Sequence, residues 1–470
     1  MMRSLFTGVS GLKTHQQKMD VIAQNIANVN TVGYKSSRTT FSEFFSQNIR
    51  TASGENDLTG RGGTNPMQVG LGVSLASIDV DMTSGAAQRT NRPLDLMVSG
   101  DGFFIVGDSS GQYFTRDGNF ILDNAGNLVN SSGLTVMGWD VREVVDSNGN
   151  ATGEYEAVQD RVQPIVIDGD KNYAPPAATD LIKITGNLNG TENPEHVTSF
   201  TFYDSVGNSW RQDVRFTWNA TDQEWTTEMK NVVYLNGDND NPYYIENGGT
   251  GTDITGEIGG LLSESGETEA WVSVDTTIKF TNQGLIDTAN GSQFNYTVTG
   301  TDMNQDAYFG VGTSTGGVYT SGPFVVDFSD LTMFGNEKAT GSAETITGRE
   351  PGTLTGMSVA ADGSIVGQYS NGETRMIAKI PVAFFSNPAG LEKAGNNLFQ
   401  ATLNSGAFDG VGADVTAGGG SLIGGALEMS NVDLSSEFTE MITTQRGFQA
   451  NSRTITTSDE MIQELVNLKR

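Results

Sequence analysis

The sequence predicts a multi-domain protein of mainly β outer domains, with long N- and C-terminal α-helices paired as a coiled-coil-like inner layer and with nested, discontinuous domains. Three observations support this fold class. Apolar residues recur every seven positions near both ends, which is typical of helices that pack against other helices. The interior has short apolar runs separated by Gly, Asp and Asn, as in β-hairpins. The 470 residues suffice for two to four domains.

The first expected element is a helix from Ser4 to Asn28. One apolar column repeats every seven residues, and Val9 fills one position of the neighbouring column, whose next two positions are Gln16 and Ala23. The resulting seam is therefore only partly apolar. The apolar column consists of Leu5, Leu12, Met19 and Ile26.

The stretch NIANVNTVGYK, residues 25–35, indicates that this helix stops. Asn is a poor residue inside a helix, because its side chain competes for backbone groups. Asn28, Asn30 and Gly33 can take turn conformations at low cost. We expect residues 31–70, which include SGENDLTGRGGTNP, to form a connecting arm.

Two β segments of one kind follow, one inside each terminal helix. Both contain Asp-Gly or Asn-Gly dipeptides between alternating apolar residues, a strong hairpin signal. If the terminal helices pair, these segments come close together, so we expect one discontinuous β domain of residues 71–149 plus 346–429. Its turn signals are Gly100 to Gly102, Asp117-Gly118, Asn124 to Gly126, Asp362-Gly363 and Asn371-Gly372.

The centre, residues 150–345, is then an outward β insertion. Phe200 and Phe202 alternate before a turn at 204–208, and apolar residues alternate again after it, which predicts a hairpin. The segment is long enough for one large or two small β domains, and the sequence does not decide between them.

The last expected element is a C-terminal helix that begins after Asn431 or Asp433, either of which can cap it, with Glu437 in the first turn. With residues 1–30, residues 430–470 form a terminal helical domain. A neighbouring column starts with Phe438 and ends with Val466 but is polar between them. The main apolar column consists of Leu434, Met441, Phe448, Ile455 and Ile462.

Two interpretations of these seams are open at this point. The helices can form a hairpin on the protein's own core, or their seams can mate with neighbouring copies of the same chain.

Composition and motifs argue against most other function classes. The net charge of −29 argues against nucleic acid or an anionic membrane as a partner. Without cysteine there are no disulfides and no thiol chemistry. The sequence has no run of 18 apolar residues, so it predicts no membrane-spanning helix. The two histidines, His15 and His196, have no ligand set nearby. We expect no enzyme activity, no cofactor and no metal, and the N-terminal residues do not have the pattern of a cleaved signal peptide.

The stretch NIANVNTVGYK resembles the N-terminal signature of the bacterial flagellar rod and hook proteins. GVSGL, the C-terminal helix sequence, RPLDLMVSGDGFFIV and FTRDGNF resemble the same family, and TFYDSVGNSW with TDQEWTTEM resembles the outer domain of its hook members. The signature positions are Asn25, Ala27, Asn28, Thr31, Gly33, Tyr34 and Lys35.

This resemblance implies a structural subunit that polymerises into the curved, flexible hook, a joint that passes motor torque from the rod to the filament. It also implies export through the flagellar type III apparatus to an extracellular hook. The implied partners are further copies of itself, the distal rod, the hook cap and the hook–filament junction proteins. In this view the two helical columns, with Val9, Phe438 and Val466, form the assembly seam.

Two alternatives compete with the hook interpretation. A distal rod protein shares both terminal signatures, but it is a shorter chain without the outer-domain motif. A secreted acidic β-rich adhesin would explain the centre of the chain but leave both helices without a purpose.

Overall fold

The computed structural model describes most of the chain. The described residues are 2–55, 60, 62–108, 111–145, 151–189, 194–203, 207–229, 232–234, 244–247, 253–257, 272–281, 283–286, 293–300, 313–315, 318–320, 324–335, 338–345 and 347–468. The described chain divides into two compact units, residues 1–168, 356–367 and 374–470 in the first and residues 169–355 and 368–373 in the second.

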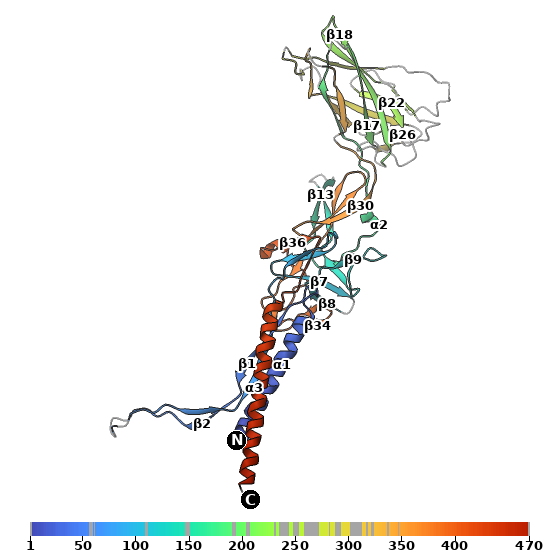
Figure 1. Ribbon diagram of the computed structural model, residues 1–470. Coiled ribbons are helices and arrows are strands. Elements are labelled where there is room, and N and C mark those ends of the chain that lie inside the picture. The colour runs from blue at the N-terminus through green and yellow to red at the C-terminus, as the bar shows by residue number, and fades with distance from the viewer. Residues whose placement is uncertain are drawn as a thin grey trace. The chain divides into compact units, whose positions relative to one another are not determined.

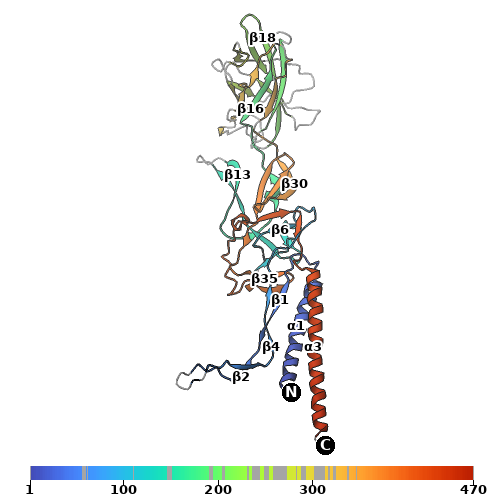
Figure 2. The same cartoon turned by 60° about the vertical axis from the view of Figure 1, so that its left-hand side comes forward.

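Two long helices lie at the ends of the chain, as the sequence predicts. They are α1 (Met2–Ala27) and α3 (Leu434–Asn467). The Asp433 side chain caps α3 by accepting a hydrogen bond from the Ser435 amide at 2.9 Å, and Glu437 lies in the first turn. The helices lie side by side (Figures 1 and 2), and the Lys18 ammonium on α1 is 3.0 Å from the Glu440 carboxylate on α3.

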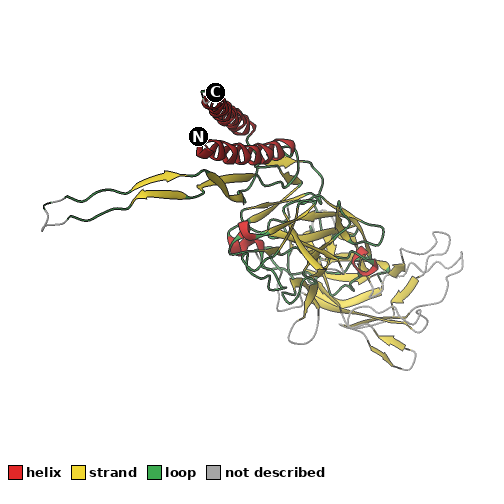
Figure 3. Ribbon diagram, turned by 90° about the horizontal axis from the view of Figure 1, so that it is seen from below, coloured by secondary structure: helices red, strands yellow, loops and turns green. Residues whose placement is uncertain are grey.

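A narrow two-stranded segment between Ser37 and Val80, which we call the ribbon, follows α1. Its strands are β1 (Ser37–Glu43), β2 (Ser46–Arg50), β3 (Met67–Gly70) and β4 (Val73–Val80), with β1 antiparallel to β4 and β2 antiparallel to β3. The outer part projects away from the helices (Figure 3). Near α1, the ring of Phe41 meets the ring of His15 edge-on, with 5.9 Å between centroids.

The sequence predicts only a connecting arm over residues 31–70, whereas the structure has strands there, and the returning strand continues to Val80. Their apolar side chains do not alternate toward a core, so the usual period of two is missing.

The β domain of the first unit joins strands from both halves of the chain. Its main sheet has the order β34-β35-β8-β7-β11-β10-β9, with β14 beside β11 and β33 beside β7. Two further pairs, β36 with β6 and β37 with β5, connect the segment before α3 to residues that follow the ribbon. These strands are β5 (Ala87–Arg89), β6 (Leu96–Ser99), β7 (Phe103–Asp108), β8 (Gly111–Thr115), β9 (Phe120–Leu122), β10 (Leu128–Asn130), β11 (Thr135–Gly138), β14 (Gln163–Pro164), β33 (Val382–Ala383), β34 (Glu392–Gly395), β35 (Leu398–Gln400), β36 (Ser421–Gly424) and β37 (Ala426–Glu428).

The remaining elements of residues 141–174 and 352–418 are short. They are the hairpin β12 (Val141–Val145) with β13 (Ala151–Ala157), the short helix α2 (Gly169–Asn172), the 3-10 turns η2 (Pro388–Gly390) and η3 (Val415–Gly418), and a sheet of order β15-β30-β31-β32. The strands of that sheet are β15 (Tyr173–Ala174), β30 (Gly352–Val359), β31 (Ser364–Tyr369) and β32 (Thr374–Lys379).

The predicted turns have two different outcomes. Residues 124–126 turn the β9–β10 hairpin, and Asp362-Gly363 and Asn371-Gly372 connect neighbouring strands of the β30-β31-β32 sheet. Residues 100–102 and Asp117-Gly118 do not close hairpins, because the strands on either side of each pair with other strands. At Gly118 a Cβ would lie 1.8 Å from the Leu96 carbonyl oxygen, so close backbone approach, not a hairpin, accounts for the glycine.

The second unit is a β structure with its own core. The predicted hairpin around residues 204–208 is present as β17 (Glu195–Tyr203) antiparallel to β18 (Ser209–Asn219), although residues 204–206 lie outside the described part. Phe202, Phe216 and Trp225 are fully buried in the core of this unit. Its other strands are β16 (Leu181–Asn187), β19 (Glu224–Met229), β20 (Val232–Tyr234), β21 (Tyr244–Asn247), β22 (Asp253–Glu257), β23 (Val272–Ile278), β24 (Gln293–Gly300), β25 (Thr313–Thr315), β26 (Val318–Thr320), β27 (Phe324–Asp327), β28 (Leu331–Thr332) and β29 (Ser342–Thr345).

Candidate assembly surfaces and the helix junction

Small residues line the contact between α1 and α3. A Cβ on Gly8 would lie 2.9 Å from Cγ1 of Ile455, and one on Gly11 would lie 2.7 Å from the Asn451 amide nitrogen. Thr14 on α1 and Thr444 and Ser458 on α3 are buried. Glycine and short polar side chains therefore let the two helices approach closely.

The predicted seam residues fall on two different faces. The α1 column and four of the five residues of the α3 column are half-buried, and Ile455 packs against Gly8. A second column, three residues after each of the first four positions of the α3 apolar column, consists of Glu437, Thr444, Asn451 and Ser458. The half-buried seam residues are Leu5, Leu12, Met19, Ile26, Met441, Phe448, Ile455 and Ile462.

Phe438 and Val466, by contrast, are exposed, as are Val9 and Leu434. The role of these four residues in an assembly seam stays a prediction. Within one chain, the second column at the contact between α1 and α3 is that of Glu437, Thr444, Asn451 and Ser458. That column was missed because its residues are small or polar, and a pattern based on apolar residues cannot find it.

Exposed apolar side chains lie on both helices. Phe6 on α1 is 68% exposed and Ile442 on α3 is 53% exposed. On α3 they form two groups, one at four-residue spacing from Leu434 to Ile442 and one at the C-terminal end from Met461 to Leu468. The exposed apolar residues of α3 and its C-cap are Leu434, Phe438, Ile442, Met461, Leu465, Val466 and Leu468.

The ribbon is also covered with exposed apolar side chains. Phe44 and Phe45, near its bend, are 70% and 64% exposed. An isolated two-stranded ribbon is marginally stable in water, so one this apolar is typical of a segment covered by another surface. Its other exposed large apolar residues are Phe41, Ile49, Met67, Val69 and Ile78.

The loop after α1 is held by Asn25, which is 2% exposed. Its amide group donates to the Ser37 carbonyl and to the Glu437 carboxylate, both at 2.9 Å. Its side-chain oxygen accepts from the Ser37 amide at 3.0 Å and from the Tyr34 hydroxyl at 3.2 Å. One side chain thus joins the end of α1, the start of the ribbon and the first turn of α3.

The other motif residues shape the same loop. Gly33 has a φ of 66°, and a Cβ there would lie 2.8 Å from the Asp117 amide nitrogen, so glycine is required. Its amide donates to the Glu428 carbonyl at 2.8 Å. The Thr31 hydroxyl donates to the Asn28 side-chain oxygen at 3.1 Å, and Ala27 is the exposed last residue of α1.

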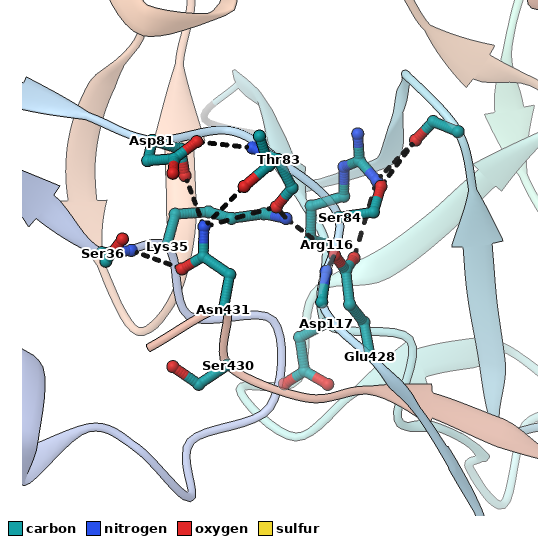
Figure 4. Close-up of polar contacts among 12 residues, drawn as sticks. Lys35, Ser36, Asp81, Thr83, Ser84, Arg116, Asp117, Glu428, Ser430 and Asn431 are labelled. Atoms are coloured by element: carbon teal, nitrogen blue, oxygen red, sulfur yellow. Dashed lines mark hydrogen bonds and ion pairs between the residues drawn. The ribbon is translucent and has the colours of Figure 1, made fainter. Parts of the chain in front are cut away.

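A buried ion pair lies beside this loop (Figure 4). The Lys35 ammonium is 2.7 Å from the Glu428 carboxylate, and their side chains are 1% and 0% exposed. Lys35 also donates to the Thr83 carbonyl at 2.7 Å, and the Gly85 amide donates to Glu428 at 2.9 Å. The Arg116 guanidinium is 3.6 Å from the other Glu428 oxygen.

Burial dominates the electrostatics of these groups. It lowers the pKa of Lys35, although the attraction of Glu428 acts in the opposite direction. Burial also raises the pKa of Glu437 and of Tyr34. We call Asn25, Tyr34, Lys35, Glu428 and Glu437 the junction, because they connect both helices to the β domain. The sequence identifies its N-terminal members through the motif, but Glu428 carries no signal of its own.

Neither a metal-binding group of side chains nor a membrane-spanning helix is present in the described residues. In them, no group of three or more His, Cys, Asp or Glu side chains could hold a metal ion. The His196 Nε2 atom donates to the Gly341 carbonyl at 2.7 Å, and His15 packs against Phe41 and Gly447. No helix in the described part is long and apolar enough to span a membrane.

Four family models match the sequence. They are the flagella basal body rod protein over residues 5–35, the flagellar hook protein FlgE/F/G D1 domain over 97–181, the flagellar basal body protein FlaE D2 domain over 170–346, and the flagellar basal body rod FlgEFG protein C-terminal over 423–468.

Curated relatives match over the whole length. The flagellar hook protein FlgE of Borreliella burgdorferi is 36% identical over 489 residues, covering 100% of both chains. That of Escherichia coli is 31% identical over 98% of each chain. The flagellar basal-body rod protein FlgG of Bacillus subtilis is 28% identical over 100% of both chains.

Proposed function

The chain belongs to the flagellar hook protein family and is a structural subunit of that kind, and we propose that copies of it polymerise through the helix pair and the ribbon into a curved, flexible tube. The observation that carries this proposal is the exposed apolar surface on α1, α3 and the ribbon. Monomeric soluble proteins rarely expose apolar patches of this extent, and such patches mark interaction sites.

In this tube α1 and α3 form the inner layer, and the β units lie outward. The domain division expected from the sequence serves the same purpose: residues 1–30 plus 430–470 assemble, residues 71–149 plus 346–429 connect, and residues 150–345 make outer contacts. The half-buried columns, together with exposed Val9, Leu434, Phe438 and Val466, are the residues we propose for the assembly seam.

We further propose a purely mechanical role for the chain, without catalysis. A tube that bends while it rotates must let neighbouring subunits slide through contacts of nearly equal energy. The strongly acidic outer residues favour hydrated, adjustable contacts over dry, locked ones. The tube then transmits torque from the rod to the filament, as an extracellular part of the flagellum reached by type III export.

The partners proposed for its two ends are the distal rod on one side and the hook cap and hook–filament junction proteins on the other. Electron microscopy of a strain lacking this gene tests the proposal. Basal bodies with a complete rod and no hook are the expected result. Basal bodies with an incomplete rod would instead favour a rod protein, and intact flagella would contradict both.

A further inference from the structure

A cleft of about 750 Å³ opens in the first unit, beside the junction. It is lined by the end of α1, by β1 and the end of β4, by residues 387–389 and by the start of α3. Val21 and Ile22 of α1 form part of its apolar floor. We call this space the acidic cleft, because five carboxylates line it: Asp79, Asp81, Asp433, Glu437 and Glu440.

The acidic cleft is only partly neutralised by the chain's own cations. Arg38 lies 3.7 Å from Asp79, but its side chain is 76% exposed. Lys18 pairs with Glu440 at 3.0 Å, and half of the Glu440 side chain remains exposed. The cleft therefore presents negative charge toward solvent and suits a basic occupant.

A basic surface lies farther along α3. Arg446 and Arg453 are seven residues apart, so they share one face of the helix at a spacing of roughly 10 Å. Both are exposed, and neither has an ion-pair partner among the described residues. Small residues, Ala450 and Thr457, lie on the same face, so the surface can enter a cleft. We call these two residues the arginine stripe.

The arginine stripe cannot reach the cleft of its own chain, because the stripe and the part of α3 that lines the cleft belong to one rigid helix. Glu440 precedes Arg446 and Arg453 by 6 and 13 positions. A second copy shifted along the helix axis by roughly 10–20 Å would bring its stripe to this cleft.

We propose that the acidic cleft of each copy receives the arginine stripe of a second copy. The contact joins two different surfaces, so it can repeat from copy to copy, and it produces a filament when the repeat does not close into a ring. Arginine suits it, because its guanidinium can hold two carboxylate oxygens at once. The inference rests on the proposed polymerisation and names one of the contacts that drive it.

Two charge-reversed variants test this contact. The cleft variant carries Asp79→Lys and Glu440→Lys, and the stripe variant carries Arg446→Glu and Arg453→Glu. Each variant alone places like charges opposite each other, so we expect its critical concentration for polymerisation, measured by sedimentation, to rise about tenfold or more.

A 1:1 mixture of the cleft variant and the stripe variant is the decisive experiment. In the mixture, the cleft of each variant faces the stripe of the other with opposite charge, so alternating copies should polymerise at close to the wild-type critical concentration. The control variant carries Arg142→Glu and Arg161→Glu. It makes the same change in net charge as the stripe variant, but at other exposed residues of the first unit. A thermal melt of each variant checks that it is folded.

The outcomes separate the two proposals. If the wild-type chain does not polymerise, the proposed function fails. If the wild-type chain polymerises and the stripe variant does so equally well, or the folded variants do not rescue each other when mixed, the cleft–stripe contact is wrong.

Discussion

At the residue scale, the family motif acts by holding the backbone rather than by chemistry. Asn25 uses both of its amide hydrogens and both lone pairs of its oxygen to join three segments. Lys35 and Glu428 bring the two ends of the chain together over 393 positions through a pair that water does not reach. These residues fix the direction in which the helices leave the β domain.

Removing one charge of the Lys35–Glu428 pair should lower the free energy of unfolding of the first unit. We expect Glu428→Gln to destabilise the first unit by about 3–5 kcal/mol, because Lys35 is left buried without its counter-ion. Glu440→Gln is the matched control, since it makes the same change in the exposed pair with Lys18 and should cost at most about 1 kcal/mol. Urea unfolding measures both values, and equal small losses would show that the buried pair does not hold the junction.

His15 should make the helix–ribbon contact sensitive to pH. Burial, followed by the charge of Lys18, lowers the pKa of His15 below its ordinary value of 6.5. The Nδ1 atom is also buried and has no hydrogen-bond partner in the described part of the chain. The unfolded chain therefore binds a proton on His15 more readily than the folded chain. The contribution of His15 to the free energy of unfolding is fully present above pH 6.5 and decreases as the pH is lowered below that value.

An NMR titration of the His15 ring measures this directly, because the chain has only two histidines and His15→Gln assigns the signal. We expect a midpoint below 6.5 in the folded protein and at the ordinary value in urea. A midpoint at or above 6.5 in the folded protein would contradict the packing of this ring.

At the element scale, each long helix has two working faces. One face of α3 meets α1 through Thr444, Gly447, Asn451 and Ser458, and the other carries exposed Phe438 and its neighbours. A single helix can therefore both pair within its chain and contact another copy.

Two phenylalanines of α3 separate these roles. Phe448→Ala should loosen the helix pair in the monomer, at a cost below the roughly 3–5 kcal/mol of a fully buried Phe, and should block polymerisation. Phe438→Ala should leave the monomer within about 0.5 kcal/mol of wild type but still weaken polymerisation. Hydrogen exchange over residues 437–462 and sedimentation give the two readouts. Normal polymerisation of Phe438→Ala would remove that face from the assembly seam.

Much of this organisation can be predicted from the sequence, and the misses have physical causes. The heptad columns and the Asp433 cap predict both helices, because apolar period and capping are local signals. The ribbon is missed, because its apolar residues lack the period of a buried strand. The close contact of Gly8 with Ile455 and the pairing of Lys35 with Glu428 depend on residues that become neighbours only in the fold.

At the scale of the whole molecule, charge is distributed unevenly. The helices α1 and α3 carry five Lys and Arg and six Asp and Glu, so they are nearly neutral in a chain of net charge −29. The acidic residues therefore belong mostly to the β units. A nearly neutral pair of helices can pack densely in an assembly, whereas the acidic parts repel each other and favour solvent.

The second unit can be removed at a defined place. The backbones of Ala177 and Arg349 exchange hydrogen bonds of 3.1 and 2.9 Å, so the chain enters and leaves there as antiparallel neighbours. Deleting residues 178–348 and closing the gap with a short Gly-Ser bridge should leave export and polymerisation intact. The product should be straighter, because contacts between outer domains are lost. Folded protein that is exported but does not polymerise would show that the centre belongs to the assembly core.

Exposed apolar faces of the helix pair and the ribbon are proposed to join copies of this chain into a tube. Electron cryomicroscopy of polymers grown from the purified protein shows whether neighbouring copies cover these faces. We expect a hollow helical tube in which α1 and α3 form the innermost layer and Phe44, Phe438 and Ile442 are covered by neighbouring copies. A polymer with those residues still exposed to solvent, or with the helices on its outer surface, would contradict the proposed assembly through the helix pair and the ribbon.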